Sequence, residues 1–418
     1  METAAQVVER EMKRAFEKGG IAGCQELMWS QLSEWQGMLM NIAIIGPSGV
    51  GKSSLINALL GLNADDTGGA KVGSNETTII SECYRHPNNE QLKLWDLPGV
   101  GTPAFPQHNY MQEIEPDKYD FFLLVTSGRF CEIDVWLATE LTKKGKGYFF
   151  VRTHMANEVA DDKKAHPRSH TEAKLVGEVR ANTETQLRKL WTTSPENMRV
   201  FLIDSYEQEK YDFSDLELQL IGNFPELKRE ALLLTLRTRN RAMIDQKAEC
   251  LRSRIWKSAA SSAGIAMIPI PGTSFAADVA ILVCQTKFYY QQFGLDTESL
   301  KRLAQQRGVN YSELEEVVTK ALGVEFLELG LCPANYFKLI SALGISLTLF
   351  EAESVAEAAV SLIPGVGTVL ASSMSYLTTS WLLGKILEKM HAFALEVYDV
   401  PAERLAAGYA NCLSTDRS

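Results

Sequence analysis

The sequence has little positive charge. Its 418 residues contain 42 Lys and Arg against 52 Asp and Glu, which gives a formal net charge of -10 at pH 7. Binding to the phosphate backbone of nucleic acids depends chiefly on clustered Lys and Arg, and no such cluster occurs along the chain. We therefore expect no DNA or RNA partner.

Paired cysteines and targeting signals are also missing. The seven cysteines are an odd number, are widely scattered and include no CxxC pair, and the six histidines show no zinc-ligand spacing. The first residues, METAAQVVEREMK, lack the charged-then-apolar order of a signal peptide and lack the second-position glycine needed for myristoylation. These absences predict free core thiols in a cytoplasmic protein.

Three regions follow one another along the chain. Residues 1–37 carry two short helical patterns, broken by glycines. Residues 38–224 contain short apolar runs, such as NIAIIG, DFFLLVTS and GYFFVR, that alternate with polar or helix-like segments. This alternation predicts a mainly parallel sheet with helices on both faces. Residues 225–418 lack strand signals and are helical in pattern.

The most specific motif is IAIIGPSGVGKSS, residues 42–54. It contains the complete GxxxxGK[ST] phosphate loop, placed directly after an apolar strand and before a helical segment. Glycines let backbone N–H groups approach phosphates, Lys52 bridges the terminal phosphates, and Ser53 can ligate Mg²⁺. The predicted nucleotide-binding residues of this loop are Gly46, Pro47, Ser48, Gly49, Val50, Gly51, Lys52, Ser53 and Ser54.

The segment LKLWDLPGVG, residues 92–101, gives a second signal. A carboxylate at a strand end beside a phosphate loop can hold Mg²⁺ through water, which is the role expected for Asp96, and Gly99 can offer its N–H to the γ-phosphate. Thr77 or Thr78 can supply a further oxygen to the metal. Small GTPases usually have a water-orienting Gln after this glycine, whereas Val100 stands here, so hydrolysis needs another group.

A weak repeat marks the helical region. Residues 268–273 and 363–368 share the pattern IPxxGT, and residues 358–384 contain no Asp, Glu, Lys or Arg. Because Pro and Gly break helices, each IPxxGT segment is predicted to form a tight helical hairpin. We expect buried hairpins in a helical domain; a transmembrane pair and transient membrane insertion are the alternatives. We expect the FYYQQF run at 288–293 to be core.

Several segments together resemble the immunity-related GTPases, the interferon-inducible GTPases of vertebrates. They are GPSGVGKSSLINALLGL, DLPGVGTPAFP, YDFFLLVTSGRF, GYFFVRT and FGLDTESLKRLA. The resemblance covers nearly the whole chain, and Gly-Lys-Ser places it with the subgroup that has the ordinary phosphate loop. It implies an α/β P-loop NTPase fold (a Ras-like G domain) with an all-α domain formed by the N- and C-terminal regions. It also implies GTP/GDP and Mg²⁺ as ligands and self-association through G domains.

The resemblance also implies site residues. Glu76 falls on the family's acidic position, which suggests catalytic assistance in a G-domain dimer, and Thr78 falls on its Mg²⁺-binding position. The implied catalytic residues are Lys52, Glu76, Thr78 and Gly99, and the implied metal ligands are Ser53, Thr78 and Asp96.

The base-binding segment departs from the family. Most GTPases have Thr-Lys-x-Asp here, and the Asp accepts hydrogen bonds from guanine N1–H and the 2-amino group, whereas this chain has Thr153, His154, Met155 and Ala156. Alanine accepts no hydrogen bond, so guanine discrimination should weaken. His154 can stack on the base, and Asn157 offers one acceptor. The predicted nucleotide-binding residues at this end are Thr153, His154, Asp204 and Ser205.

Three hypotheses follow from these residues. The first is a Mg²⁺-dependent GTPase that assembles on nucleotide binding and serves cell-autonomous defence, cytoplasmic or peripheral on intracellular membranes. The second is a regulatory nucleotide-binding scaffold with weak or absent hydrolysis and relaxed base specificity. The third is a membrane-remodelling protein whose C-terminal hairpins insert.

Overall fold

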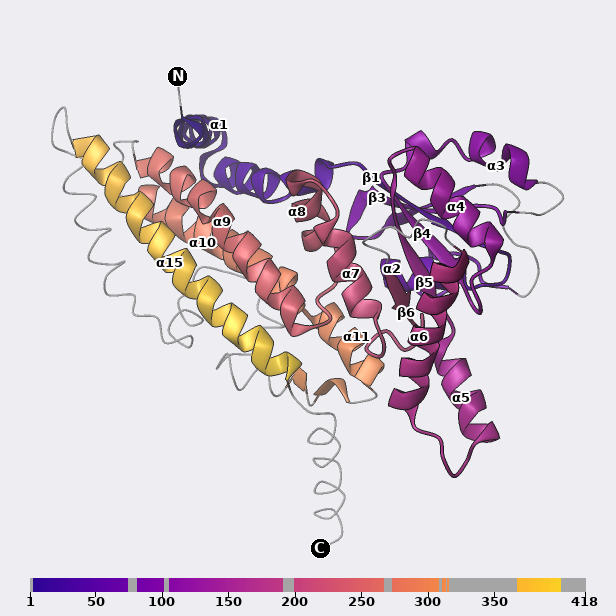
Figure 1. Ribbon diagram of the computed structural model, residues 1–418. Helices are drawn as coiled ribbons and strands as arrows, with labels where there is room; N and C mark the ends of the chain where they lie inside the picture. The colour runs from indigo at the N-terminus through magenta and orange to yellow at the C-terminus, as the bar shows by residue number, and fades with distance from the viewer. Residues whose placement is uncertain are drawn as a thin grey trace, which may run out of the picture. The chain divides into compact units, whose positions relative to one another are not determined.

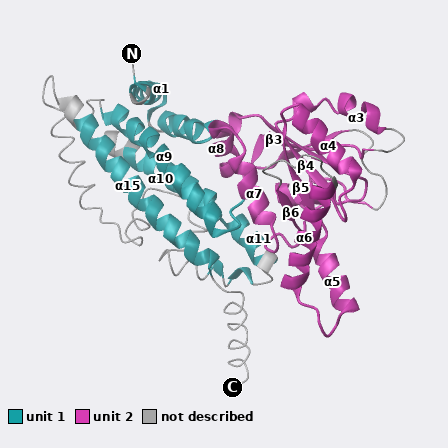
Figure 2. Cartoon of the chain, viewed as in Figure 1, with its two compact units in different colours: residues 1–34, 237–418 teal, residues 35–236 magenta. Residues whose placement is uncertain are grey.

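The computed structural model describes residues 3–73, 81–100, 105–190, 199–266, 273–307, 310–312, 314–315 and 367–399. The chain divides into two compact units (Figure 2). One unit is residues 35–236, and the other combines residues 1–34 with residues 237–418.

The first unit is built on a six-stranded sheet of described residues, in the order β2-β3-β1-β4-β5-β6 (Figure 1). The strands are β1 (Met40–Ile45), β2 (Glu82–His86), β3 (Asn89–Asp96), β4 (Phe121–Thr126), β5 (Gly147–Arg152) and β6 (Val200–Leu202). Only β2 runs antiparallel to its neighbour within this sheet. Every residue of β4 is buried, as expected for a central parallel strand covered on both faces. The predicted α/β fold class is confirmed.

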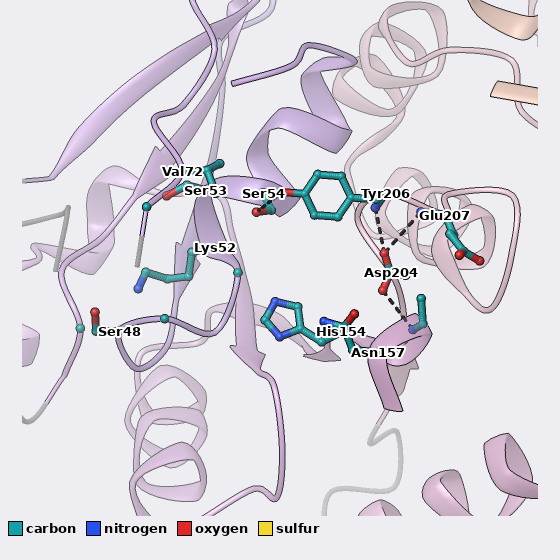
Figure 3. Close-up of a pocket in the computed structure, with 15 residues that line it drawn as sticks. Ser48, Lys52, Ser53, Ser54, Val72, His154, Asn157, Asp204, Tyr206 and Glu207 are labelled. Carbon is teal, nitrogen blue, oxygen red and sulfur yellow. Dashed lines mark hydrogen bonds between the residues drawn. The ribbon is translucent and has the colours of Figure 1, made fainter. Parts of the chain in front are cut away.

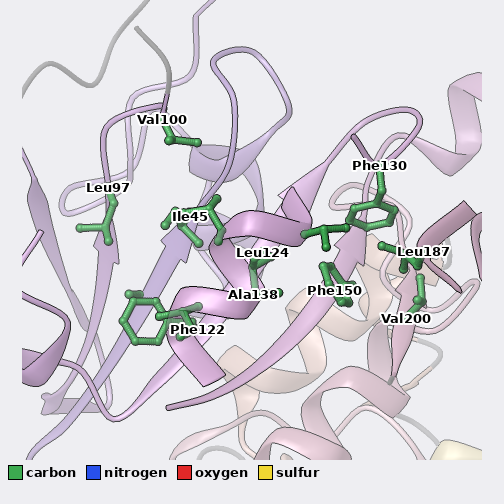
Figure 4. Packing of buried hydrophobic residues seen from close by; sticks show 14 of the residues in the cluster. Ile45, Leu97, Val100, Phe122, Leu124, Phe130, Ala138, Phe150, Leu187 and Val200 are labelled. Carbon is green, nitrogen blue, oxygen red and sulfur yellow. The ribbon is translucent and has the colours of Figure 1, made fainter. Parts of the chain in front are cut away.

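Helices of this unit cover both faces of the sheet. They are α2 (Lys52–Leu60), α3 (Gln107–Glu113), α4 (Glu132–Lys143), α5 (Met155–Ala165), α6 (Glu172–Leu190), α7 (Phe213–Gly222) and α8 (Glu226–Thr235), with short 3₁₀ turns at Glu34–Gly37 and Pro116–Lys118. On one face, Phe122 and Phe150 pack with Leu137 and Leu141 of α4 and Leu187 of α6 in a buried cluster (Figure 4). Alternate side chains point to the opposite face, which α2, α7 and α8 contact.

The unit boundary lies later than the sequence suggested. The α/β region was expected to end at 224, whereas α8 belongs to the same unit as the sheet. This helix contacts β3, and Asn89 Nδ2 donates a hydrogen bond to Thr235 Oγ1 at 3.0 Å. Leu232, Leu233 and Leu234 are all buried. The helical pattern of residues 226–235 is the same for a helix packed on a sheet and for one packed on other helices, so sequence could not place the boundary.

The described residues of the second unit form α1 (Ala4–Leu32), α9 (Arg241–Ala266), α10 (Thr273–Gln292), α11 (Thr297–Arg307) and α15 (Gly367–Tyr398). Helix α9 contacts α1, α10 and α15, so segments from both ends of the chain share one helical core. Gly264 permits close approach, because a Cβ there would lie 2.3 Å from the Glu9 carbonyl oxygen. Arg254 donates to the Leu32 carbonyl oxygen at 3.1 Å, which ties the end of α1 to α9. The expected helical domain built from both ends is therefore present.

The predicted hairpins at the IPxxGT segments lie mostly outside the described residues. Only residue 273 of the first segment (268–273) and residues 367–368 of the second (363–368) are described. None of the described helices is long and apolar enough to cross a membrane. The expectation that the FYYQQF run is core is confirmed, since Phe288, Tyr289, Tyr290 and Phe293 are all buried.

Candidate nucleotide-binding site

A pocket of about 460 Å³ opens at the carboxyl edge of the sheet (Figure 3). Residues from the phosphate loop, the start of α5 and the loop after β6 surround it. They are Ser48, Gly49, Gly51, Lys52, Ser53, Ser54, Val72, Gly73, Gly99, His154, Ala156, Asn157, Asp204, Tyr206 and Glu207. Ligands of open α/β sheets bind beyond the carboxyl ends of the strands, which is where this pocket lies.

The phosphate loop connects the end of β1 to the start of α2. Gly51 caps α2 in the left-handed conformation, with φ of 87°, which glycine adopts without strain. Gly46 passes close to β4, since a Cβ there would lie 2.1 Å from the Val125 carbonyl oxygen. The loop therefore has the glycines that its path requires, and its backbone turns around the N-terminus of α2, where negative charge is favoured.

Lys52 is buried within this loop. Its Nζ donates hydrogen bonds to the carbonyl oxygens of Gly46 at 3.2 Å and Pro47 at 3.0 Å. These carbonyls hold the ammonium group at the pocket, which Lys52 lines. Gly46, Pro47 and Val50 were predicted to bind nucleotide, but they are not among the residues that line the pocket; the first two supply acceptors for Lys52.

Ser53 and Asp96 meet across the sheet edge. Ser53 Oγ donates to Asp96 Oδ2 at 2.8 Å, and Asp96 is buried at the end of β3. A hydroxyl and a carboxylate are oxygen donors of the kind that Mg²⁺ prefers, so this pair fits the metal predicted from the sequence. Glu76 and Thr78, the other predicted catalytic and metal residues, lie outside the described residues. Elsewhere in the described ranges, no group of three or more His, Cys, Asp or Glu side chains converges on a metal site.

The DLPG turn packs against the phosphate loop. Gly99 lines the pocket, and a Cβ at this position would lie 3.2 Å from the Ser48 nitrogen. Tyr110 donates to the Pro98 carbonyl oxygen at 2.7 Å, and burial raises the pKa of this tyrosine, so it remains a neutral donor. Val100 is buried in the core cluster. The residue that replaces the usual Gln therefore points into the protein rather than toward the pocket.

The segment after β5 forms the other end of the pocket. Thr153 is buried, and its Oγ1 donates to the Val50 carbonyl oxygen at 2.6 Å. Thr153 therefore ties the strand end to the phosphate loop instead of lining the pocket. His154 begins α5 with φ of 61° and lines the pocket beside Gly51, where a Cβ would lie 3.0 Å from His154 Nε2.

The loop after β6 completes this end. Asp204 lines the pocket, as expected, whereas Ser205 does not; the Ser205 carbonyl oxygen accepts a hydrogen bond from Gln208. Tyr206 and Glu207 also line the pocket, although no sequence motif marks them. The Tyr206 hydroxyl lies 3.2 Å from Ser54 Oγ (Figure 3). Their position directly after Asp204 is the signal that could have identified them.

Comparison with protein families decides the relationship. The model of the Interferon-inducible GTPase (IIGP) family matches residues 5–325. The chain belongs to the interferon-inducible GTPase family. The resemblance noted in the sequence is confirmed at family level, and the match extends from the first helix across the α/β unit into the helical unit.

Individual members of the interferon-inducible GTPase family are similar over most of their length. Interferon-inducible GTPase 5 of Rattus norvegicus is 33% identical over 91% of this chain and 79% of its own. Interferon-gamma-inducible GTPase 10 of Mus musculus is 32% identical, over 73% of each chain. Among solved structures, NFeoB from S. thermophilus bound to GDP·AlF4⁻ and K⁺ is 16% identical over 73% of this chain and 99% of its own, with a TM-score of 0.29.

Proposed function

We propose that this chain is a Mg²⁺-dependent GTPase that binds GTP and GDP in the pocket between the phosphate loop and α5. The observation that carries the proposal is the placement of buried Lys52 beside the hydrogen-bonded pair Ser53 and Asp96, all at the N-terminus of α2. This arrangement concentrates the groups that bind a triphosphate and its metal ion. Family membership supports guanosine nucleotides as the ligands.

Each residue of the phosphate end has a role in hydrolysis. Lys52 exchanges its bonds to the Gly46 and Pro47 carbonyls for the terminal phosphate oxygens and stabilises their charge. Ser53 and Asp96 would hold Mg²⁺, and the ion would supply positive charge that offsets the charge of the phosphates. The Gly99 N–H contacts the γ-phosphate, while Thr78 remains the predicted second protein ligand of the metal.

A second copy of the chain completes catalysis in this proposal. Val100 is buried, so position 100 offers no group that orients the attacking water. We assign this assistance to Glu76 in a dimer formed through the G domains. The Gly-Lys-Ser subgroup, peripheral contact with intracellular membranes and a role in cell-autonomous innate defence belong to the same proposal. The subgroup is proposed from Gly51, Lys52 and Ser53, and the other two from the resemblance to the family.

GTP hydrolysis measured over a range of protein concentrations tests this function. The hydrolysis rate per molecule should rise with protein concentration, because assembly supplies Glu76 from a second copy. The Lys52→Ala variant should show no hydrolysis. A constant rate per molecule would contradict assembly-coupled hydrolysis. Tight nucleotide binding without GTP hydrolysis at any protein concentration would contradict the GTPase and favour the nucleotide-binding scaffold.

The membrane part has its own test. Flotation of the full chain with liposomes in GTP and in GDP should show nucleotide-dependent recovery in the lipid fraction. Equal absence from that fraction with both nucleotides would remove membrane contact from the proposal and leave the GTPase intact.

A further inference from the structure

The base end of the pocket contains a buried carboxylate. Asp204 follows β6, is 5% exposed and lines the pocket. Among the described residues, three backbone N–H groups donate to it: Ala156 to Oδ2 at 3.0 Å, Tyr206 to Oδ1 at 3.0 Å and Glu207 to Oδ1 at 3.4 Å. Figure 3 shows these bonds on the side of His154 away from Lys52. The carboxylate is therefore fixed in place at the far end from the phosphate-binding lysine.

Asp204 retains hydrogen-bonding capacity. An ionised carboxylate offers about four acceptor positions. The three N–H donors use two positions on Oδ1 and one on Oδ2, which leaves one position on Oδ2. This oxygen bonds the backbone of Ala156, in the first turn of α5, where the helix dipole favours negative charge.

We infer that Asp204 supplies, from the loop after β6, the carboxylate that purine recognition needs and that Ala156 cannot provide. The inference rests on the proposed nucleotide site. The open position on Oδ2 accepts a hydrogen bond from the N1–H of a 6-oxopurine. Adenine has an acceptor at N1, so its lone pair would face the carboxylate and the base would be disfavoured.

The other groups at this end discriminate less. His154 and Tyr206 line the pocket with rings, and ring stacking accepts any purine. Asn157 carries both a donor and an acceptor and so suits either base. The Glu207 carboxylate pairs with Lys210 Nζ at 2.5 Å, which partly neutralises it. Asp204 is thus the group whose hydrogen-bonding character separates the purines.

The geometry specifies a substrate class that is broader than guanine and includes other 6-oxopurines. A single open acceptor reads N1–H, which guanine and hypoxanthine share, and leaves the 2-amino group of guanine without a carboxylate partner. Affinities for GTP and ITP should therefore agree within about threefold, while ATP should bind about tenfold more weakly or worse, as expected for one charged hydrogen bond.

The test compares two carboxylates of the same loop. Dissociation constants for GTP, ITP and ATP are measured by competition with a fluorescent nucleotide for the full chain, Asp204→Asn and Glu209→Gln; Glu209 is exposed and does not line the pocket. Asp204→Asn places a donor where N1–H must bind, so the preference for GTP over ATP should fall about tenfold. Glu209→Gln should leave that preference unchanged. Adding Ala156→Asp to Asp204→Asn should restore it, because the carboxylate returns to the same place from α5.

Different results would contradict the role of Asp204 and the proposed nucleotide binding. Equal weakening of all three nucleotides by Asp204→Asn would reduce Asp204 to a structural role and overturn the inference, as would a changed preference in Glu209→Gln alone. GTP binding far tighter than ITP in the unmodified chain would also overturn it, since a second acceptor would then read the 2-amino group. Binding of no nucleotide by the unmodified chain would overturn the proposed function and the inference together.

Discussion

The two ends of the pocket are built differently. At the phosphate end, consecutive residues of one loop provide the lysine, the hydroxyl and the turn, and Asp96 joins them from the neighbouring strand. At the base end, the wall is assembled from the start of α5 and the loop after β6. Local sequence can specify the first end nearly alone. The second end depends on how strands far apart in the chain are brought together, so one position can change while another takes over its role.

The phosphate end should carry most of the affinity, and Lys52→Ala tests this most strongly. Removing a buried ammonium group that meets phosphate should weaken GTP and ATP alike by on the order of a hundredfold. Calorimetric titration of each nucleotide measures the effect. Lys163→Ala, at an exposed position on α5, is the matched control and should bind normally. A selective loss of one nucleotide would contradict the division between the ends.

Adjacent serines separate the two ends in a second comparison. Ser53 bonds Asp96, whereas Ser54 lies against Tyr206. Ser53→Ala should lower GTP affinity about tenfold in Mg²⁺ and change it little in EDTA, because a metal ligand is lost. Ser54→Ala should show no such Mg²⁺ dependence. Titrations of both variants in each buffer check the prediction, which an equal response of the two serines would contradict.

The base end should gain selectivity when His154→Lys and Ala156→Asp are combined. The new carboxylate adds acceptors beside Asp204, so GTP should gain about tenfold over ATP and also gain over ITP. Competition binding with the three nucleotides measures this. An unchanged ratio would mean that the segment from Thr153 to Asn157 does not meet the base.

The smallest effect is expected from Tyr206→Phe. The ring stays and the hydroxyl contact with Ser54 is lost, at a site where the side chain is 76% exposed. All nucleotides should weaken by less than about threefold, with unchanged ratios, because an exposed hydrogen bond contributes little. A marked change in base preference would show that the hydroxyl itself reads the base.

The sequence predicts where the phosphate loop lies in the fold, because the loop depends on a short, ordered motif; nucleotide binding by its residues stays a prediction. It placed Lys52, Ser53 and Asp96 correctly beside one another but could not show that Pro47 and Val50 serve through their carbonyls. It also assigned Thr153 to the nucleotide, whereas the Thr153 hydroxyl bonds Val50. Side-chain direction in such turns is set by tertiary contacts that composition and periodicity do not contain.

Other differences have the same origin. Tyr206 was missed because no local pattern distinguishes a loop tyrosine that lines a pocket from one that points into solvent. Asp204 was expected near the base, but its three backbone donors, which leave a single open acceptor, come from two separate segments.

The sharing of the helical unit between both chain ends bears on how the protein is made. Helix α1 leaves the ribosome before the α/β unit, whereas its partner α9 begins only at Arg241, after the whole α/β unit has been synthesised. The face of α1 that is buried in the folded protein includes Met12, Cys24 and Met28. This face is therefore exposed to solvent until α9 has been synthesised. Release of the chain before α9 is made would leave this face without its native cover.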